Sequence, residues 1–151
     1  MKGQELRKGA DHGSEEGRRV LRRGRAAMKE RAAELKRQKN SATAEADLLA
    51  KIAELDDVDR ALAERVHALV KEHAPHLTAK TYYGMPGWAK DGKVLVFLQP
   101  AGKFKTRYAT LGFQDDAALD DGGMWPTAYA LTTLTPEHET VIAGLLKRAA
   151  A

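Results

Sequence analysis

The spacing of apolar residues changes near Lys80, and this change limits the folds open to the chain. Before Lys80, apolar residues recur every three or four positions, as they do on one face of an amphipathic helix. After it, short apolar runs alternate with turn residues, and Asp91-Gly92 separates two of these runs. Because Asp-Gly favours the positive φ angles of a two-residue hairpin turn, the sequence predicts paired antiparallel strands here.

Two helices are predicted ahead of the strands. Residues 48–55 and 58–70 each carry apolar side chains at helical spacing. Asp56 and Asp57 lie at the break between them, where either carboxylate could cap the second helix. This helix should end before Pro75, because proline cannot continue the hydrogen-bond ladder.

Four strands and a final helix are predicted after Lys80. The strands cover residues 81–83, 94–98, 108–113 and 128–133, with a turn at 84–87. Residues 94–98 are apolar on both faces, which predicts a central strand covered by helices on at least one side. Thr135 and Pro136 start the last helix. The expected class is α+β, an antiparallel sheet with helices packed on one face.

The basic residues concentrate at the N-terminal end. Residues 1–47 hold 13 Lys/Arg against 8 Asp/Glu, whereas residues 48–151 hold 12 against 13. The first segment has no Phe, Trp, Tyr or Ile, so it can bury little apolar surface on folding. We expect a basic, flexible or partly helical tail over 1–47, with a helix at 26–39 and a hinge at 40–43. An α+β domain should follow over 48–151.

Five arginines lie close together in this tail and suggest contact with nucleic acid. They are Arg18, Arg19, Arg22, Arg23 and Arg25. On a helix, pairs four apart would repel each other, and a phosphate backbone would remove that repulsion. Gly17 and Gly24 disfavour a helix before a partner binds. The alternative is a solvated, disordered extension.

Carboxylates cluster around the start of the second predicted helix. Glu54, Asp56, Asp57 and Asp59 are candidates for holding a hard cation such as iron or magnesium through their oxygens. The alternative interpretation is that Asp56 and Asp57 cap the helix while the other carboxylates are solvated.

Two further groups admit both a functional and a structural interpretation. Lys103, Lys105 and Arg107 would share one side of an extended chain, where they could bind an anion or protect a sheet edge from aggregation. Aromatic and thioether side chains could line a ligand or protein-binding pocket, or could simply complete the core. The chief members of that group are Tyr83, Met85, Trp88 and Trp125.

Neither catalysis nor a membrane location is indicated. The sequence has no convincing Ser/His/Asp arrangement and no glycine-rich phosphate loop, which predicts a protein without enzymatic activity. It lacks cysteine, which fits a reducing compartment. No secretory signal or apolar run of bilayer length is evident, so we expect a cytoplasmic protein with no membrane partner.

Several of these motifs occur together in one known family. Tyr83-Gly84-Met85-Pro86, the Lys-Asp-Gly-Lys hairpin at 90–93 and a strand ending in Gly-Phe resemble the YdhG-like domain of unknown function. The resemblance runs from about residue 48 to residue 150. Most members have proline soon after Gly-Phe, whereas this chain continues with Gln-Asp-Asp.

The resemblance implies a fold similar to that of frataxins and suggests a role in iron handling. One Bacillus member of the family is regarded as an intracellular iron chaperone. By analogy, the chain would bind ferrous iron weakly at Glu54, Asp56, Asp57 and Asp59 and pass it to an acceptor protein.

Overall fold

The computed structural model describes the backbone of residues 2–151 and the side chains from residue 15 onward. The chain divides into two compact units, Met1–Asn40 and Ser41–Ala151. Helix α1 (Lys2–Ala53) includes residues 40–43, which the sequence had suggested as a hinge. The abundant Ala, Arg, Lys, Glu and Leu of this segment favour a helix and outweigh the cost of Gly17 and Gly24.

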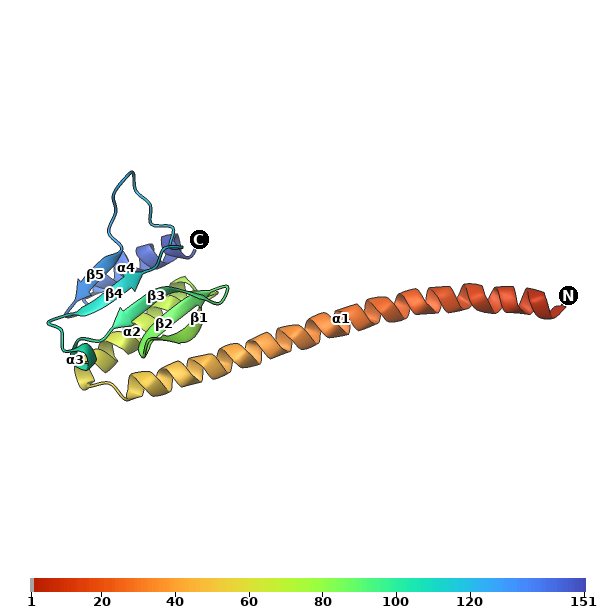
Figure 1. The fold of residues 1–151 in the computed structure, drawn as a ribbon, viewed down its shortest axis with the longest axis horizontal. Helices are drawn as coiled ribbons and strands as arrows, with labels where there is room; N and C mark the ends of the chain where they lie inside the picture. Colours follow the sequence, from red (N-terminus) through yellow and green to blue (C-terminus); the bar gives the residue numbers. More distant parts are fainter. Residues whose placement is uncertain (1) are drawn as a thin grey trace. The chain divides into compact units, whose positions relative to one another are not determined.

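The second unit is an α+β fold, as predicted. After α1 come α2 (Asp57–His73), β1 (Thr78–Tyr82), β2 (Met85–Lys90), β3 (Lys93–Gln99) and α3 (Ala101–Phe104). β4 (Ala109–Phe113), β5 (Ala128–Leu131) and α4 (Pro136–Ala149) complete the chain. Helices α2 and α4 lie against one face of the sheet (Figure 1). Within the described residues, no helix is long and apolar enough to cross a membrane.

The five strands form an antiparallel sheet in sequence order, which confirms the central position of β3. Ala79, Trp88, Val96 and Phe113 align across four strands, and all four belong to the core that α2 and α4 cover. Because neighbouring side chains in a strand point to opposite faces, the adjacent row faces away from the helices. That row contains Lys80, Gly87, Phe97 and Gly112, and we call this side of the sheet the open face.

The helix starts follow local capping signals. Asp56 caps α2 by accepting a hydrogen bond from the backbone N–H of Asp59. Thr135 caps α4 by accepting from the N–H of His138, whose ring in turn accepts from the N–H of Thr135. The predicted start of the last helix is therefore confirmed.

One turn prediction and one edge-strand interpretation need correction. The turn expected at 84–87 is a two-residue turn at Tyr83–Gly84, and β2 already begins at Met85. Residues 103–108 do not form an edge strand, because α3 occupies Ala101–Phe104 and Lys105 adopts a positive φ of 54°. Lys103, Lys105 and Arg107 therefore do not form a row along a strand.

Candidate functional site

One side of helix α1 is strongly basic. Residues 15–40 hold ten Lys/Arg and four Asp/Glu. Arg18, Arg22, Arg25 and Lys29 are spaced four, three and four residues apart, which puts them on one helical face. All four side chains are exposed. We call this set the basic stripe.

Other side chains of α1 flank the basic stripe. Leu21 lines a shallow depression together with the three arginines of the basic stripe. The other two predicted arginines, Arg19 and Arg23, are four residues apart and form a second exposed row about 100° around the helix. Glu16 and Glu34 lie on the side of the helix opposite the stripe, while Glu30 lies about 110° and Glu15 about 50° from its centre.

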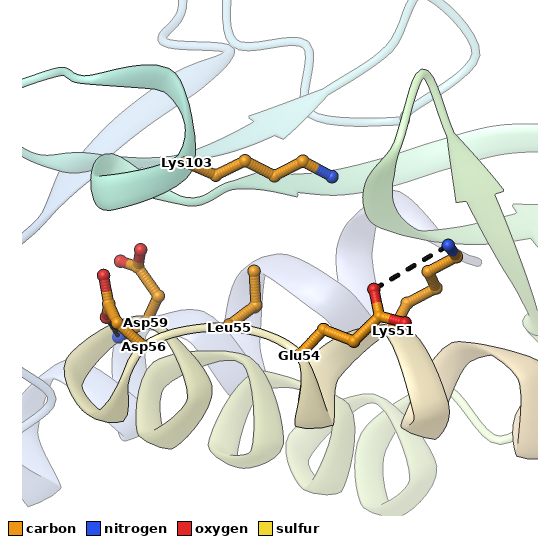
Figure 2. Close-up of a pocket in the computed structure, with 6 residues that line it drawn as sticks. All are labelled: Lys51, Glu54, Leu55, Asp56, Asp59 and Lys103. Carbon is orange, nitrogen blue, oxygen red and sulfur yellow. Dashed lines mark hydrogen bonds and ion pairs between the residues drawn. The ribbon is translucent and has the colours of Figure 1, made fainter.

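A second candidate site is a pocket of about 360 Å³ at the corner between α1 and α2 (Figure 2). It brings Glu54, Asp56 and Asp59 together with Lys51 and Lys103. Three of the four predicted metal-binding carboxylates thus line one pocket together with two lysines.

Hydrogen bonds give two of these carboxylates structural roles. Asp59 is only 3% exposed, and its oxygens accept from the backbone N–H of Ala101 at 3.2 Å and of Gly102 at 2.8 Å. It therefore caps α3 from α2, while Asp56 caps α2 with a 2.9 Å bond. A Cβ added at Gly102 would lie 2.9 Å from Asp59 Oδ2, which shows how tightly the two elements pack.

The remaining two carboxylates have basic partners. Asp57 accepts from Arg60 at 2.7 Å and does not line the pocket, and Glu54 pairs with Lys51 at 3.8 Å. Across the residues whose side chains are described, no group of three or more His, Asp or Glu side chains could hold a metal ion. The four predicted ligands do not converge on one point.

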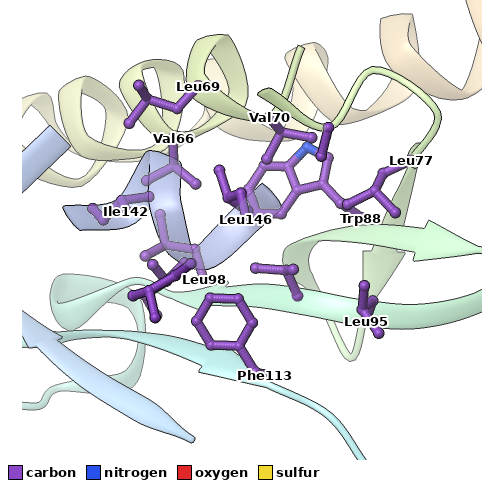
Figure 3. Close-up of a cluster of buried hydrophobic side chains, with 14 of the residues drawn as sticks. Val66, Leu69, Val70, Leu77, Trp88, Leu95, Leu98, Phe113, Ile142 and Leu146 are labelled. Atoms are coloured by element: carbon purple, nitrogen blue, oxygen red, sulfur yellow. The ribbon is translucent and has the colours of Figure 1, made fainter. Parts of the chain in front are cut away.

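The predicted aromatic pocket is divided between two environments. Trp88 is 1% exposed and packs in the main core between the sheet and the helices (Figure 3). Trp125 is half-buried against the same core. Tyr83 is 83% exposed at the β1–β2 turn beside Gly84, whereas Met85 and Pro86 are buried in β2. These residues do not line a common pocket, and Trp88 belongs to the core.

A polar network next to Trp88 was not anticipated from the sequence. The Trp88 indole N–H donates to His67 Nδ1 at 3.1 Å, so the hydrogen of the His67 ring is on Nε2. This Nε2 lies 3.1 Å from Glu45 Oε1. The same oxygen accepts from Lys71 at 2.8 Å. The hydrogen bond from Lys71 and, after it, that from His67 hold the pKa of Glu45 below its ordinary value. Both ring nitrogens of His67 are engaged, so the network joins α1, α2 and β2.

The chain matches no family model, and no curated protein or solved structure shows significant similarity to it. The resemblance to the YdhG-like domain therefore stays a prediction.

Proposed function

We propose that this protein is a non-catalytic nucleic-acid-binding protein whose basic stripe on α1 contacts the phosphate backbone. The observation that carries the proposal is the helical alignment of Arg18, Arg22, Arg25 and Lys29, all exposed. At 1.5 Å per residue, these four charges extend over about 16 Å of the helix axis. Double-stranded DNA carries about one negative charge per 1.7 Å, so several phosphates lie within reach of such a stripe.

The apolar content of α1 favours a charged partner over an apolar one. Leu21, Met28 and Leu35 are exposed and recur at intervals of seven residues. A coiled-coil seam needs two apolar positions per heptad, and a membrane-surface helix needs a broad apolar face. These three residues and Val20, which is also exposed, form neither a two-position seam nor a broad apolar face, so the positive charge is the dominant recognition feature.

The test is a comparison of salt dependence between the full chain and a triple variant, Arg18→Gln/Arg22→Gln/Arg25→Gln. Glutamine retains helix propensity, so the variant should keep the helix and lose only charge. Removing three phosphate contacts should reduce the slope of log K against log salt by about 2.7 on duplex DNA. The corresponding triple Arg→Lys variant is the control, because lysine keeps the charge. An unchanged slope in the glutamine variant would contradict the proposal.

Ferrous-iron delivery in the manner of frataxins is a separate prediction from the YdhG-like resemblance. An α+β sandwich is compatible with it, but the capping bonds of Asp56 and Asp59 explain these carboxylates without a metal. Anaerobic calorimetric titration of ferrous iron, with magnesium as a control, tests it. Selective binding that is lost when Asp56, Asp57 and Asp59 are changed to Asn would favour iron delivery.

A further inference from the structure

A row of aromatic rings crosses the open face of the sheet. The Tyr82 ring lies 4.7 Å from that of Tyr83 and 5.3 Å from that of Phe97, centroid to centroid. Met85 is buried on this side of the sheet, and the register shift between Trp88 and Ala89 brings Val94 to the same side, outside the main core cluster. The open face therefore has a small apolar cluster of its own, from which the three rings emerge.

Two glycines in register allow these rings to lie against the sheet. Phe97 pairs with Gly87 on one side and with Gly112 on the other. A Cβ at Gly112 would meet three atoms of the Phe97 ring, one of them at 2.9 Å, so this ring lies across β4. A Cβ at Gly87 would lie 3.2 Å from the Cβ of Tyr82. Phe97 and Tyr82 are only half-buried, which leaves aromatic surface exposed.

The turn at Tyr83–Gly84 departs from the usual residue choice. Both two-residue turns of the sheet have positive φ at both positions, 49° and 76° at Tyr83–Gly84 and 52° and 81° at Asp91–Gly92. Asp-Gly is a preferred pair for such a turn, whereas a bulky side chain is disfavoured at the first position. Tyr83 occupies that strained position and yet remains 83% exposed, so burial does not compensate for the strain. Strained, exposed residues of this kind occur preferentially at binding sites.

Lysines flank the aromatic row. A groove of about 410 Å³ on the open face is lined by Tyr82 and Tyr83 together with Lys80 and Lys93. Lys80 donates to the carbonyl of Gly92 at 3.0 Å, and Lys93 pairs with a neighbouring acid, Asp116, at 3.0 Å. Beside the Tyr83 turn, Lys103 donates to the carbonyl of Gly84 at 2.6 Å. Each of these ammonium groups has three donors, so donors remain for a phosphate oxygen.

We infer that the open face is a stacking surface for the bases of single-stranded nucleic acid, with Tyr83, Tyr82 and Phe97 contacting bases and Lys80 and Lys103 contacting phosphates. This inference rests on the proposed function, in which the basic stripe supplies sequence-independent phosphate contacts. Bases in a duplex stack on each other and present only their edges, whereas bases in a single strand can stack on protein rings. The open face therefore selects single strands over duplexes.

The experiment measures the affinity of the full-length chain by fluorescence anisotropy. The probes are a labelled oligothymidine of about 12 nucleotides and a labelled mixed-sequence duplex of the same length. The key variant is Tyr83→Asn, because asparagine is favoured at this turn position and the variant should fold at least as well as the parent. Tyr83→Phe is the matched control, since it keeps the ring and removes only the hydroxyl group.

The expected result is tighter binding of oligothymidine than of duplex by the parent chain. Tyr83→Asn should weaken oligothymidine binding roughly tenfold and leave duplex binding unchanged, while Tyr83→Phe should bind like the parent. Equal oligothymidine affinity in Tyr83→Asn and the parent would overturn the inference. The inference would also be overturned if the parent chain bound the duplex as tightly as oligothymidine. The open face would then be a candidate protein contact.

The Arg18→Gln/Arg22→Gln/Arg25→Gln variant separates the two proposals. If it loses affinity for both probes while Tyr83→Asn behaves like the parent, the proposed function stands and the stacking inference fails. If the parent chain binds neither probe at low salt, both fail.

Discussion

Asp59 connects α2 to α3, and its removal should destabilise the second unit by a calculable amount. In Asp59→Ala, the backbone N–H groups of Ala101 and Gly102 lose a charged acceptor. A hydrogen bond to a charged group contributes about 1.5–3 kcal/mol. Because α3 lies at the surface and its freed N–H groups can be hydrated, the lower end applies, and we expect a loss of about 3 kcal/mol for the two bonds.

Thermal and urea unfolding, followed by tryptophan fluorescence, measure this loss. Both tryptophans, Trp88 and Trp125, pack in or against the core of the second unit, so their fluorescence reports on that unit separately from residues 1–40. At about 4 °C per kcal/mol for a domain of this size, Tm should fall by about 12 °C. Asp59→Asn keeps one acceptor oxygen and should lose about half as much free energy.

Asp56→Asn is the control for this prediction, because asparagine is as good a helix N-cap as aspartate. Its stability should stay within about 0.5 kcal/mol of the parent. If the stability of Asp59→Ala were also within about 0.5 kcal/mol of that of the parent, the capping role assigned to the Asp59 carboxylate would be refuted.

Three other predictions concern the polar network and two glycines. Because the pKa of Glu45 is lowered in the folded state, its pairing with Lys71 should contribute its full stabilisation of the fold above about pH 4.3, the ordinary pKa of a glutamate. This contribution should be lost as the pH falls through the pKa of Glu45 in the folded state. Urea titrations should therefore show Glu45→Gln less stable than the parent at pH 7, with the difference shrinking in acid; a constant difference would contradict this. Gly112→Ala should cost about 1–3 kcal/mol in the same assay, because its Cβ would meet the Phe97 ring. Gly144→Ala, in α4 with open space around its Cα, should instead stabilise by about 0.5–1 kcal/mol, and a loss there would count against the packing described.

Local signals in the sequence predicted those parts of the fold that depend on neighbouring residues. Asp91-Gly92 specifies its hairpin through backbone preferences of two residues. Thr135 caps α4 within one turn. The central position of β3 was predictable because residues 94–98 are apolar on both faces, and helices α2 and α4 cover one of those faces.

Features that depend on distant residues were not predictable in the same way. The alternation in residues 103–108 suggested a strand, but Asp59, more than forty residues earlier, supplies the acceptor that stabilises α3 instead. The hydrogen bond between Glu45 and His67 likewise joins the predicted tail to α2.

The candidate site likewise has some features that neighbouring residues determine and others that depend on distant residues. The sequence was sufficient to identify the arginines of α1, because their spacing and charge are local properties. It could not decide whether Trp88 lay in a pocket or in the core, since that depends on which face of the sheet the helices cover. The aromatic row on the open face emerges only when the register of β1, β2 and β3 places Tyr82 diagonally from Phe97, close enough for the two rings to contact each other.

The most direct test of nucleic-acid binding is the affinity of the full chain for duplex DNA at a series of salt concentrations between about 50 and 200 mM. If the four charges of the basic stripe contact phosphates, the slope of log K against log salt should be about −3.6 or steeper. A slope near zero, or no measurable binding at the lowest salt concentration, would contradict the proposed function.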